Sequence, residues 1–312
     1  MTRPYYNTLL KRHESNPLIV PADFPHGQAD AVFNCGQAML GDQTILLVSV
    51  VLANGEETNT WVARSDDGVN FTFDEKPLFQ RVEVPGLREL DRHIIDTRVT
   101  RIDDTYYIVR PTGGIVAALM YKTTDFRRVE FVDCIAHPHN RVPCLFPEKI
   151  GGYYWKIDRP SVGRPPDNPG GMWTSRSPDL IHWGHFRPLL GPFGSWGTFK
   201  IGPTPPIRTE EGWLVVIHGV KKSCSTTRYS VGAILLDLEN PERVIAGPGS
   251  YLITPETDYE IQGRTPDVIF TCGAIADLDR RRLRMYYGGG DTVICLATGD
   301  LDEILDALKK GR

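Results

Sequence analysis

Four basic side chains stand in apolar or proline-bounded stretches of the sequence, where a charge without a partner is costly. They are Arg141, Arg159, Lys200 and His218. Each needs an anion nearby, and the 39 Asp and Glu residues supply one kind of partner. A ligand phosphate is the other kind, since it carries about −1.5 to −2 charges and suits forked guanidinium groups. The residues alone leave both partners open.

Asp96 is a single carboxylate in the stretch His93–Arg98, with isoleucines on its N-terminal side. Burial favours the protonated form of a carboxyl group, which would make Asp96 a usable general acid. Arg98, two residues on, favours the charged form instead. The pattern by itself favours the simpler alternative, a salt bridge between Asp96 and Arg98 across a turn.

The other motifs in the sequence give weaker indications of a functional site. Gly288-Gly289-Gly290 before Asp291 lacks the lysine and the helix of a phosphate loop, so it predicts a tight strand end. His137 and His139 favour a solvated loop over a metal site. The sequence holds neither G-x-S-x-G nor H-E-x-x-H. We therefore expect no metal and no organic cofactor.

Composition excludes one broad class of partner. The chain has 312 residues, 41% apolar and 24% charged, as in ordinary soluble proteins. A net charge of −4 provides no basic field for nucleic acid. Any anion site must therefore be a local cluster that acts against the mean charge.

The cysteines and the apolar runs favour a cytoplasmic protein. Six cysteines form no C-x-x-C pair and read as buried thiols in a reducing compartment. No stretch has the length of a signal peptide or a membrane span. The residues leave open whether the chain forms a homo-oligomer. The cysteines are Cys35, Cys134, Cys144, Cys224, Cys272 and Cys295.

Short β-branched and aromatic runs, which end at turn residues, must position these groups. The clearest strand patterns are Thr44–Val51, Tyr106–Arg110, Tyr153–Ile157, Trp213–His218 and Val231–Leu238. One helix is predicted at the tail. Asp300 precedes it, Glu303 follows as in a capping box, and Leu301, Ile304, Leu305 and Leu308 share one face.

A weak repeat predicts the architecture. Ser65–Phe71, Thr124–Phe126 with Phe131, and Ser177–Trp183 each combine a turn with an aromatic residue. The copies lie about 50 to 60 residues apart, near the length of one four-stranded propeller blade. No linker divides the chain. We therefore expect residues 1–312 to form a single all-β domain, a five-bladed β-propeller with a short C-terminal helix.

An ordered set of short stretches resembles glycoside hydrolase family 130, the mannoside phosphorylases and related β-mannosidases. Single pieces are weak, but the set runs in family order across nearly the whole chain. The family's fold is a five-bladed propeller. The stretches are Val32–Asn34, Ala63–Gly68, Ile95–Arg98, Leu145–Ile150, Arg159–Pro160, Ser177–Trp183, Lys200–Gly202, Gly212–Leu214, His218–Val220, Tyr229–Ala233, Leu235–Leu238, Pro255–Glu256, Tyr259–Glu260 and Tyr286–Gly288 with Asp291.

The resemblance implies a role for each of eight residues. Asp96 matches the catalytic acid, and Asn34 and Asp291 match residues that hold the transferred sugar. The groups that match the phosphate-binding set are Arg141, Arg159, Lys200, His218 and Tyr229.

These roles imply an inverting phosphorylase that cleaves a β-mannoside with inorganic phosphate to give α-mannose 1-phosphate. An inverting hydrolase needs a second carboxylate to activate water, but phosphate is already a nucleophile. In the family, the acid is thought to pass its proton through a hydroxyl of the bound mannose. The alternatives are an inverting β-mannosidase and a glycan-binding propeller without turnover. The expected partners are an oligosaccharide and phosphate, with no nucleic acid and no membrane.

Three positions depart from the family pattern, although Asp96 and Arg98 both match it. Thr97 replaces the usual proline between the acid and its arginine, and Cys35 replaces a small residue after Asn34. An arginine that usually contacts the sugar is missing near Ser49 or Val50. The identity of the donor sugar or its linkage therefore depends on what occupies that position.

Overall fold

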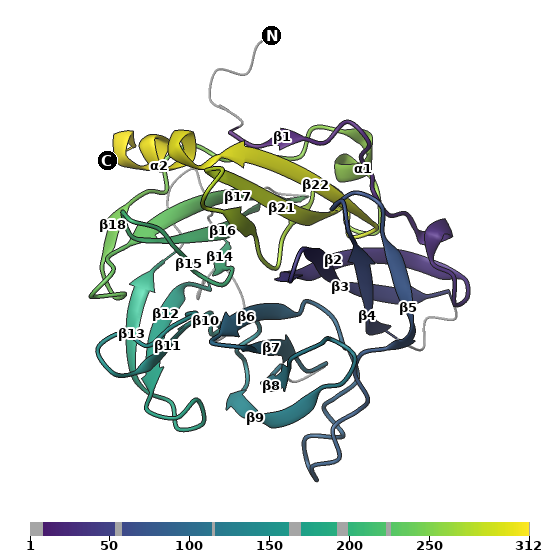
Figure 1. Cartoon of the computed structure of the whole chain (residues 1–312), viewed down its shortest axis with the longest axis horizontal. Helices are drawn as coiled ribbons and strands as arrows, with labels where there is room; N and C mark the ends of the chain where they lie inside the picture. The colour runs from purple at the N-terminus through teal and green to yellow at the C-terminus, as the bar shows by residue number, and fades with distance from the viewer. Residues whose placement is uncertain are drawn as a thin grey trace.

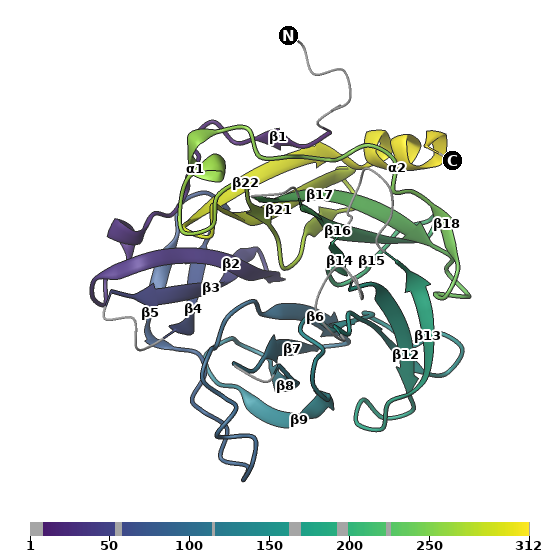
Figure 2. The ribbon, with the colours of Figure 1, turned by 180° about the vertical axis from the view of Figure 1, so that it is seen from behind.

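Five antiparallel sheets form a ring around a common centre (Figures 1 and 2). The computed structural model describes residues 9–53, 58–113, 116–161, 170–191, 199–222 and 226–311. Each sheet is one blade, and β6, β10 and β14 lie nearest the centre in Figure 1. The predicted five-bladed β-propeller is therefore confirmed.

The first three blades have four strands each, in sequence order from the centre outward. Blade 1 holds β2 (Ala29–Leu40), β3 (Gln43–Leu52), β4 (Thr58–Ser65) and β5 (Thr72–Pro77). Blade 2 holds β6 (Arg98–Ile102), β7 (Thr105–Pro111), β8 (Ala118–Thr123) and β9 (Glu130–Ala136). Blade 3 holds β10 (Cys144–Leu145), β11 (Tyr154–Asp158), β12 (Met172–Ser177) and β13 (Gly184–Leu190).

The last two blades each carry one extra short strand. Blade 4 holds β14 (Lys200–Pro203), β16 (Trp213–Lys222), β17 (Thr227–Leu236) and β18 (Val244–Ala246), with β15 (Ile207–Arg208) beside β16. Blade 5 holds β19 (Ile269–Phe270), β21 (Arg282–Gly289), β22 (Val293–Asp300) and β1 (Lys11–Arg12), with β20 (Ile275–Asp277) beside β21.

Strand β16 shows how the blades pack. Leu214 and Val216 belong to an apolar cluster shared with blade 5, whereas Val215 and Ile217 belong to one shared with blade 3. Successive side chains of a strand point to opposite faces, so this strand is buried on both sides. The blades therefore stabilise one another through a continuous ring of apolar contacts.

The predicted blade repeat is a turn between the third and fourth strands. In blade 1 the Asp67 carboxylate accepts hydrogen bonds from the backbone N–H groups of Val69 and Asn70. Asp125 and Asp179 do the same in blades 2 and 3. In blade 2 the repeat begins at Thr123, whose hydroxyl accepts from Phe126, and not at Thr124.

The predicted C-terminal helix is confirmed as α2 (Leu301–Lys310). Asp300 caps it by accepting a hydrogen bond from the Glu303 N–H at 3.0 Å, and its four predicted apolar residues are buried. Two shorter elements, the 3-10 helix η1 (Pro21–Asp23) and α1 (Asp258–Ile261), have no periodic signal and were not predicted. In the described ranges, no helix is long and apolar enough to cross a membrane.

Blade 5 is completed by both ends of the described chain. Strand β1 pairs with β22 through Lys11 with Thr298 and Arg12 with Ala297. The Arg12 guanidinium then reaches the fully buried Glu260 carboxylate at 2.8 Å. Contacts about 290 residues apart in the sequence therefore close the ring.

The cysteines largely follow the expected burial. Cys35, Cys144, Cys272 and Cys295 are buried free thiols, and Cys134 is partly exposed. The sixth, Cys224, lies outside the described residues.

Candidate active site

Eight predicted site residues line one cavity of about 240 Å³ at the centre of the ring. All five blades contribute to it, because each sends a strand end or a turn toward the common axis. The eight are Asn34, Asp96, Arg141, Arg159, Lys200, His218, Tyr229 and Asp291. We call this space the catalytic cavity.

One wall of the catalytic cavity carries amide and carboxylate side chains, and it comes from blades 1, 2 and 5. Asn34 lies on β2 where the pairing with β3 shifts register, and Asp96 lies two residues before β6. Asp291 lies in the turn between β21 and β22. All three adopt left-handed backbone angles, with φ of 43°, 55° and 50° respectively. Asn and Asp tolerate this conformation better than other residues with side chains, and such strained positions cluster at functional sites.

Blades 3 and 4 supply the basic side. Arg141 lies in the segment that leads into β10, and Arg159 directly follows β11. Lys200 is the first residue of β14, and His218 and Tyr229 lie on the paired strands β16 and β17. The cavity thus has carboxylates on one wall and cations on the other.

Asn34 ties the two carboxylates together. Its amide nitrogen donates to Asp96 Oδ1 at 3.0 Å and to Asp291 Oδ1 at 3.3 Å. Gly288 makes room for this arrangement, since a Cβ there would lie 2.3 Å from Asn34 Oδ1. The Gly288-Gly289-Gly290 signal thus marks a close approach at a strand end, where β21 stops at Gly289.

Asp96 is 5% exposed and is held on both its backbone and its side chain. Its second carboxylate oxygen contacts Arg141 Nη2 at 3.3 Å. Its backbone N–H donates to Ser49 Oγ at 3.1 Å, and that hydroxyl donates to the Asn34 carbonyl at 2.9 Å. Asp96 is therefore oriented by residues of β2 and β3 and by Arg141 from the segment before β10.

The salt bridge between Asp96 and Arg98 that the pattern favoured is not formed. Arg98 is 1% exposed and donates from Nη1 to the Asp96 carbonyl oxygen at 2.5 Å, not to the carboxylate. The same Nη1 lies 2.9 Å from Cys272 Sγ, and the guanidinium lies over the Phe270 ring. Arg98 thus contacts the backbone of the turn at Asp96, and Asn34 and Arg141 contact the Asp96 carboxylate instead.

Near Ser49 and Val50, where the family pattern has an arginine, the chain has a serine that orients Asp96. Ser49 and Val50 are both 0% exposed, and neither lines the catalytic cavity. Ser49 instead joins Asn34 to Asp96, a role that the sequence did not indicate because a serine within an apolar strand gives no distinctive signal.

Two of the three cations on the basic wall lack a carboxylate partner among the described residues, whereas the third, Arg141, contacts Asp96. Within the described residues Arg159 and Lys200 form no salt bridge, and Arg159 Nε has no hydrogen-bond acceptor although it is buried. Burial, reinforced by Arg141, lowers the pKa of Arg159 to about 10. Burial, reinforced by Arg159 and Arg141, lowers the pKa of Lys200 to about 7. Positive charge is therefore concentrated here and poorly compensated.

His218 and Tyr229 are neutral hydrogen-bonding partners on this wall. Burial, followed by the charge of Arg159, holds the pKa of His218 well below its usual value, so the ring is uncharged at neutral pH. Burial raises the pKa of Tyr229 to about 12 and also raises the pKa of Asp291. In the part of the chain that the structure describes, no group of His, Cys, Asp and Glu could hold a metal ion. The donor set favours an oxyanion.

A second cavity of about 380 Å³ opens beside the first. The two share Phe33, Ile95, Arg141 and Asp291, so a molecule in the catalytic cavity can extend directly into it. We call it the acceptor cavity. Its remaining walls come from blades 1 and 2 and from the segment before β19.

The profile of glycoside hydrolase family 130, described as β-1,4-mannooligosaccharide phosphorylase, matches residues 24–310. The chain belongs to glycoside hydrolase family 130. This family 130 member is 31% identical to β-1,4-mannooligosaccharide phosphorylase of Ruminococcus albus over 96% of its own length and 90% of the relative. It is 38% identical to β-1,2-mannobiose phosphorylase of Listeria innocua over 80% of its own length and 68% of the relative.

A solved structure agrees with this assignment. β-1,2-Mannobiose phosphorylase from Listeria innocua, in complex with β-1,2-mannobiose, superimposes on the family 130 member with a TM-score of 0.85 at 31% identity. The match covers 96% of this chain and 99% of the other. The propeller is therefore shared over its whole length.

Proposed function

We propose that this chain is an inverting glycoside phosphorylase that cleaves a β-mannoside with inorganic phosphate and releases α-mannose 1-phosphate. The observation that carries the proposal is a pair of cations, the buried Arg159 and the half-buried Lys200, that face the same cavity as Asp96 and have no carboxylate partner among the described residues. An unpaired buried charge destabilises a protein unless a ligand compensates it. Phosphate matches this wall in charge and in hydrogen-bond geometry.

The chemistry follows from the two walls. Phosphate on the basic wall is the nucleophile, held in line with the anomeric carbon of a mannosyl group that contacts Asn34 and Asp291. The proton for the departing sugar oxygen originates from Asp96. The bond from carbon to the leaving oxygen breaks as the bond to phosphate oxygen forms, on the opposite face of the ring, so the configuration inverts.

The spacing of Asp96 and Asp291 argues against inverting hydrolysis in which Asp291 acts as the base. Inverting hydrolases separate their two carboxyl groups by about 6.5–9.5 Å to admit a water molecule. Here Asp96 Oδ1 and Asp291 Oδ1 both accept from the same Asn34 nitrogen, at 3.0 and 3.3 Å, which leaves no such gap. No glutamate is among the described residues that line the catalytic cavity.

The mannosyl donor rests on the relatives. The two curated relatives and the complexed structure carry the names of mannoside phosphorylases that act on β-1,4 or β-1,2 linkages. We propose a β-mannoside donor on that ground, with the leaving sugar in the acceptor cavity.

The deciding experiment compares substrates with and without inorganic phosphate. β-1,4-Mannobiose, β-1,2-mannobiose and mannosyl-glucose are incubated with the protein, and the products are followed by phosphorus and proton NMR. We expect α-mannose 1-phosphate from at least one substrate, and only when phosphate is present. Free mannose at equal rates in both conditions would identify a hydrolase instead, and binding without any turnover would identify a glycan-binding propeller.

Phosphate binding is expected to weaken as the pH rises above about 7. Lys200 has a pKa of about 7 in the empty cavity, so it is charged below that pH and neutral above it. Bound phosphate favours the charged form, so each phosphate bound above pH 7 takes up one proton. The KM for phosphate should rise about tenfold per pH unit between pH 7 and 9, measured by initial rates at saturating mannoside.

Lys200→Arg provides the matched control for that profile, because arginine stays charged throughout the range. The KM of this variant for phosphate should stay nearly flat between pH 7 and 9. Identical slopes in the two proteins would show that Lys200 does not titrate against phosphate.

A further inference from the structure

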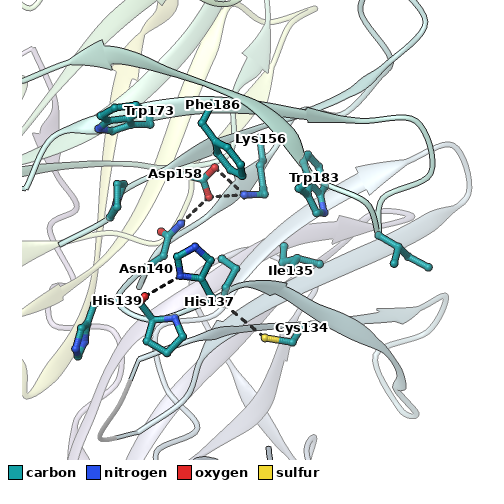
Figure 3. Close-up of a pocket in the computed structure, with 14 residues that line it drawn as sticks. Cys134, Ile135, His137, His139, Asn140, Lys156, Asp158, Trp173, Trp183 and Phe186 are labelled. Carbon is teal, nitrogen blue, oxygen red and sulfur yellow. Dashed lines mark hydrogen bonds and ion pairs between the residues drawn. The ribbon is translucent and has the colours of Figure 1, made fainter. Parts of the chain in front are cut away.

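A third cavity, of about 440 Å³, lies between blades 2 and 3 and takes no part in the proposed reaction (Figure 3). Blade 3 contributes three aromatic rings, Trp173, Trp183 and Phe186, and the segment after β9 contributes His137 and Asn140. We call it the aromatic cavity. Trp173 is 38% exposed and Phe186 is 51% exposed, although large aromatic side chains are normally well buried.

A buried ion pair holds the floor of this cavity rigid. Lys156 Nζ lies 2.5 and 2.6 Å from the Asp158 oxygens, and both side chains are almost fully buried. The ammonium lies 4.9 Å from the Trp183 ring centre, and the indole N–H donates to the Leu180 carbonyl at 2.8 Å. The Trp183 ring is therefore fixed before any ligand arrives.

The chemistry of the walls selects an uncharged ligand. Lys156 and Asp158 neutralise each other, so the floor attracts neither anions nor cations. The aromatic faces require an apolar surface, whereas the exposed His137 and His139 rings offer hydrogen-bonding nitrogens nearby. A pyranose ring combines an apolar C–H face with a rim of hydroxyl groups, and it fits this mixture of contacts.

The aromatic cavity lies next to the proposed active site, on the other side of the segment that holds Asn140 and Arg141. Arg141 lines both the catalytic and the acceptor cavities, and its neighbour Asn140 lines the aromatic cavity. The Asn140 N–H donates to the carbonyl of Val116, which lines the acceptor cavity, at 3.0 Å. Asn140 Oδ1 also accepts from the Arg159 N–H at 3.1 Å. Asn140 and its bonded neighbours therefore form a wall common to both sites, with the aromatic rings on one side and the acceptor cavity on the other.

We propose that the aromatic cavity is a distal subsite that binds a sugar unit of a mannooligosaccharide, away from the bond that is cleaved. This inference rests on the proposed function and narrows its substrate class to oligosaccharides longer than two units. Trp173 supplies the stacking surface, because its ring stands at the mouth of the cavity beside Asp158.

Trp173→Ala tests the subsite, with Tyr153→Ala as the matched control. Tyr153 is also an aromatic residue of blade 3 with 38% exposure, but it stands at the opposite end of β11 and lines none of the three cavities. Phosphorolysis rates are measured on mannooligosaccharides of increasing length. We expect the KM of the parent protein to fall with length and Trp173→Ala to raise the KM for the longest substrate roughly tenfold. The disaccharide KM should hardly change.

A binding measurement separates this inference from the proposed function. Asp96→Asn, with and without Trp173→Ala, is titrated with mannohexaose and mannobiose by calorimetry without phosphate. Tighter binding of the hexaose that disappears with Trp173→Ala supports the subsite even if no phosphorolysis is found. Equal hexaose affinity in the Trp173→Ala and Tyr153→Ala proteins would overturn it, as would equal affinity of the Asp96→Asn protein for both sugars. Phe186→Ala repeats the test at a second exposed ring.

Discussion

Asp96→Asn is expected to lower kcat for mannoside phosphorolysis by about 10²- to 10⁴-fold, the usual contribution of a general acid. Asparagine keeps the volume of the side chain and still accepts the hydrogen bond from Asn34. It also tolerates the left-handed backbone at this position, where φ is 55°. Binding of the sugar, measured by calorimetry, should therefore survive while turnover is lost.

Asp103→Asn is the matched control for that variant. Asp103 has nearly the same backbone angle, with φ of 53°, but it is exposed in the turn between β6 and β7. Its substitution should leave kcat unchanged. An aryl mannoside with a good leaving group needs no acid, so the Asp96→Asn protein should recover most of its rate on it. Near-normal turnover of mannobiose by Asp96→Asn would rule out Asp96 as the acid.

Arg159→Ala is expected to raise the KM for phosphate roughly tenfold to a hundredfold, because one charge-assisted hydrogen bond contributes about 1.5–3 kcal/mol. Its guanidinium is 4% exposed and has no carboxylate partner among the described residues, so removing it leaves no charge unpaired. The KM for the mannoside at saturating phosphate should change little. Initial rates over a grid of both substrate concentrations separate the two effects.

Removing Arg159 is also expected to change the pKa of its neighbour Lys200. Arg159 is one of the charges that lower the pKa of Lys200, so that pKa should rise in Arg159→Ala and move the pH break in phosphate binding upward. Arg101→Ala, at an exposed arginine paired with Asp104, provides the control and should alter neither quantity. An unchanged KM for phosphate in Arg159→Ala would show that Arg159 does not bind phosphate.

Much of this architecture could be predicted because its signals are local. Short β-branched runs identify strands, and the serine or threonine turn before an aspartate recurs in each of the first three blades. Basic residues within apolar stretches identified the cavity wall, since buried charge is unusual enough to stand out. The resemblance then placed Asn34, Tyr229 and Asp291 beside them, and all line one cavity.

The remaining features depend on contacts between blades, which leave no local pattern. In the sequence, Ser49 is one more residue of a predicted strand. Only the fold brings β2 and the turn at Asp96 to its hydroxyl group. Arg98 pairs with a carbonyl group and lies beside Cys272, 174 residues away, so sequence proximity to Asp96 was misleading. The aromatic cavity likewise gathers rings from β12 and β13 opposite the end of β9, and no motif spans those elements.

The closure of blade 5 by β1 sets the order in which this protein can mature on a ribosome. Strand β22 is the last strand to be synthesised, and only then can Lys11 and Arg12 pair with Thr298 and Ala297. Asp291 lies in the turn just before β22, so the wall formed by Asn34, Asp96 and Asp291 becomes complete in the same step that closes the ring. Contacts so distant in sequence form slowly because the intervening chain must first be ordered. A nascent chain with four blades therefore has its basic wall and its acid but no finished cavity, and catalytic competence arrives together with ring closure.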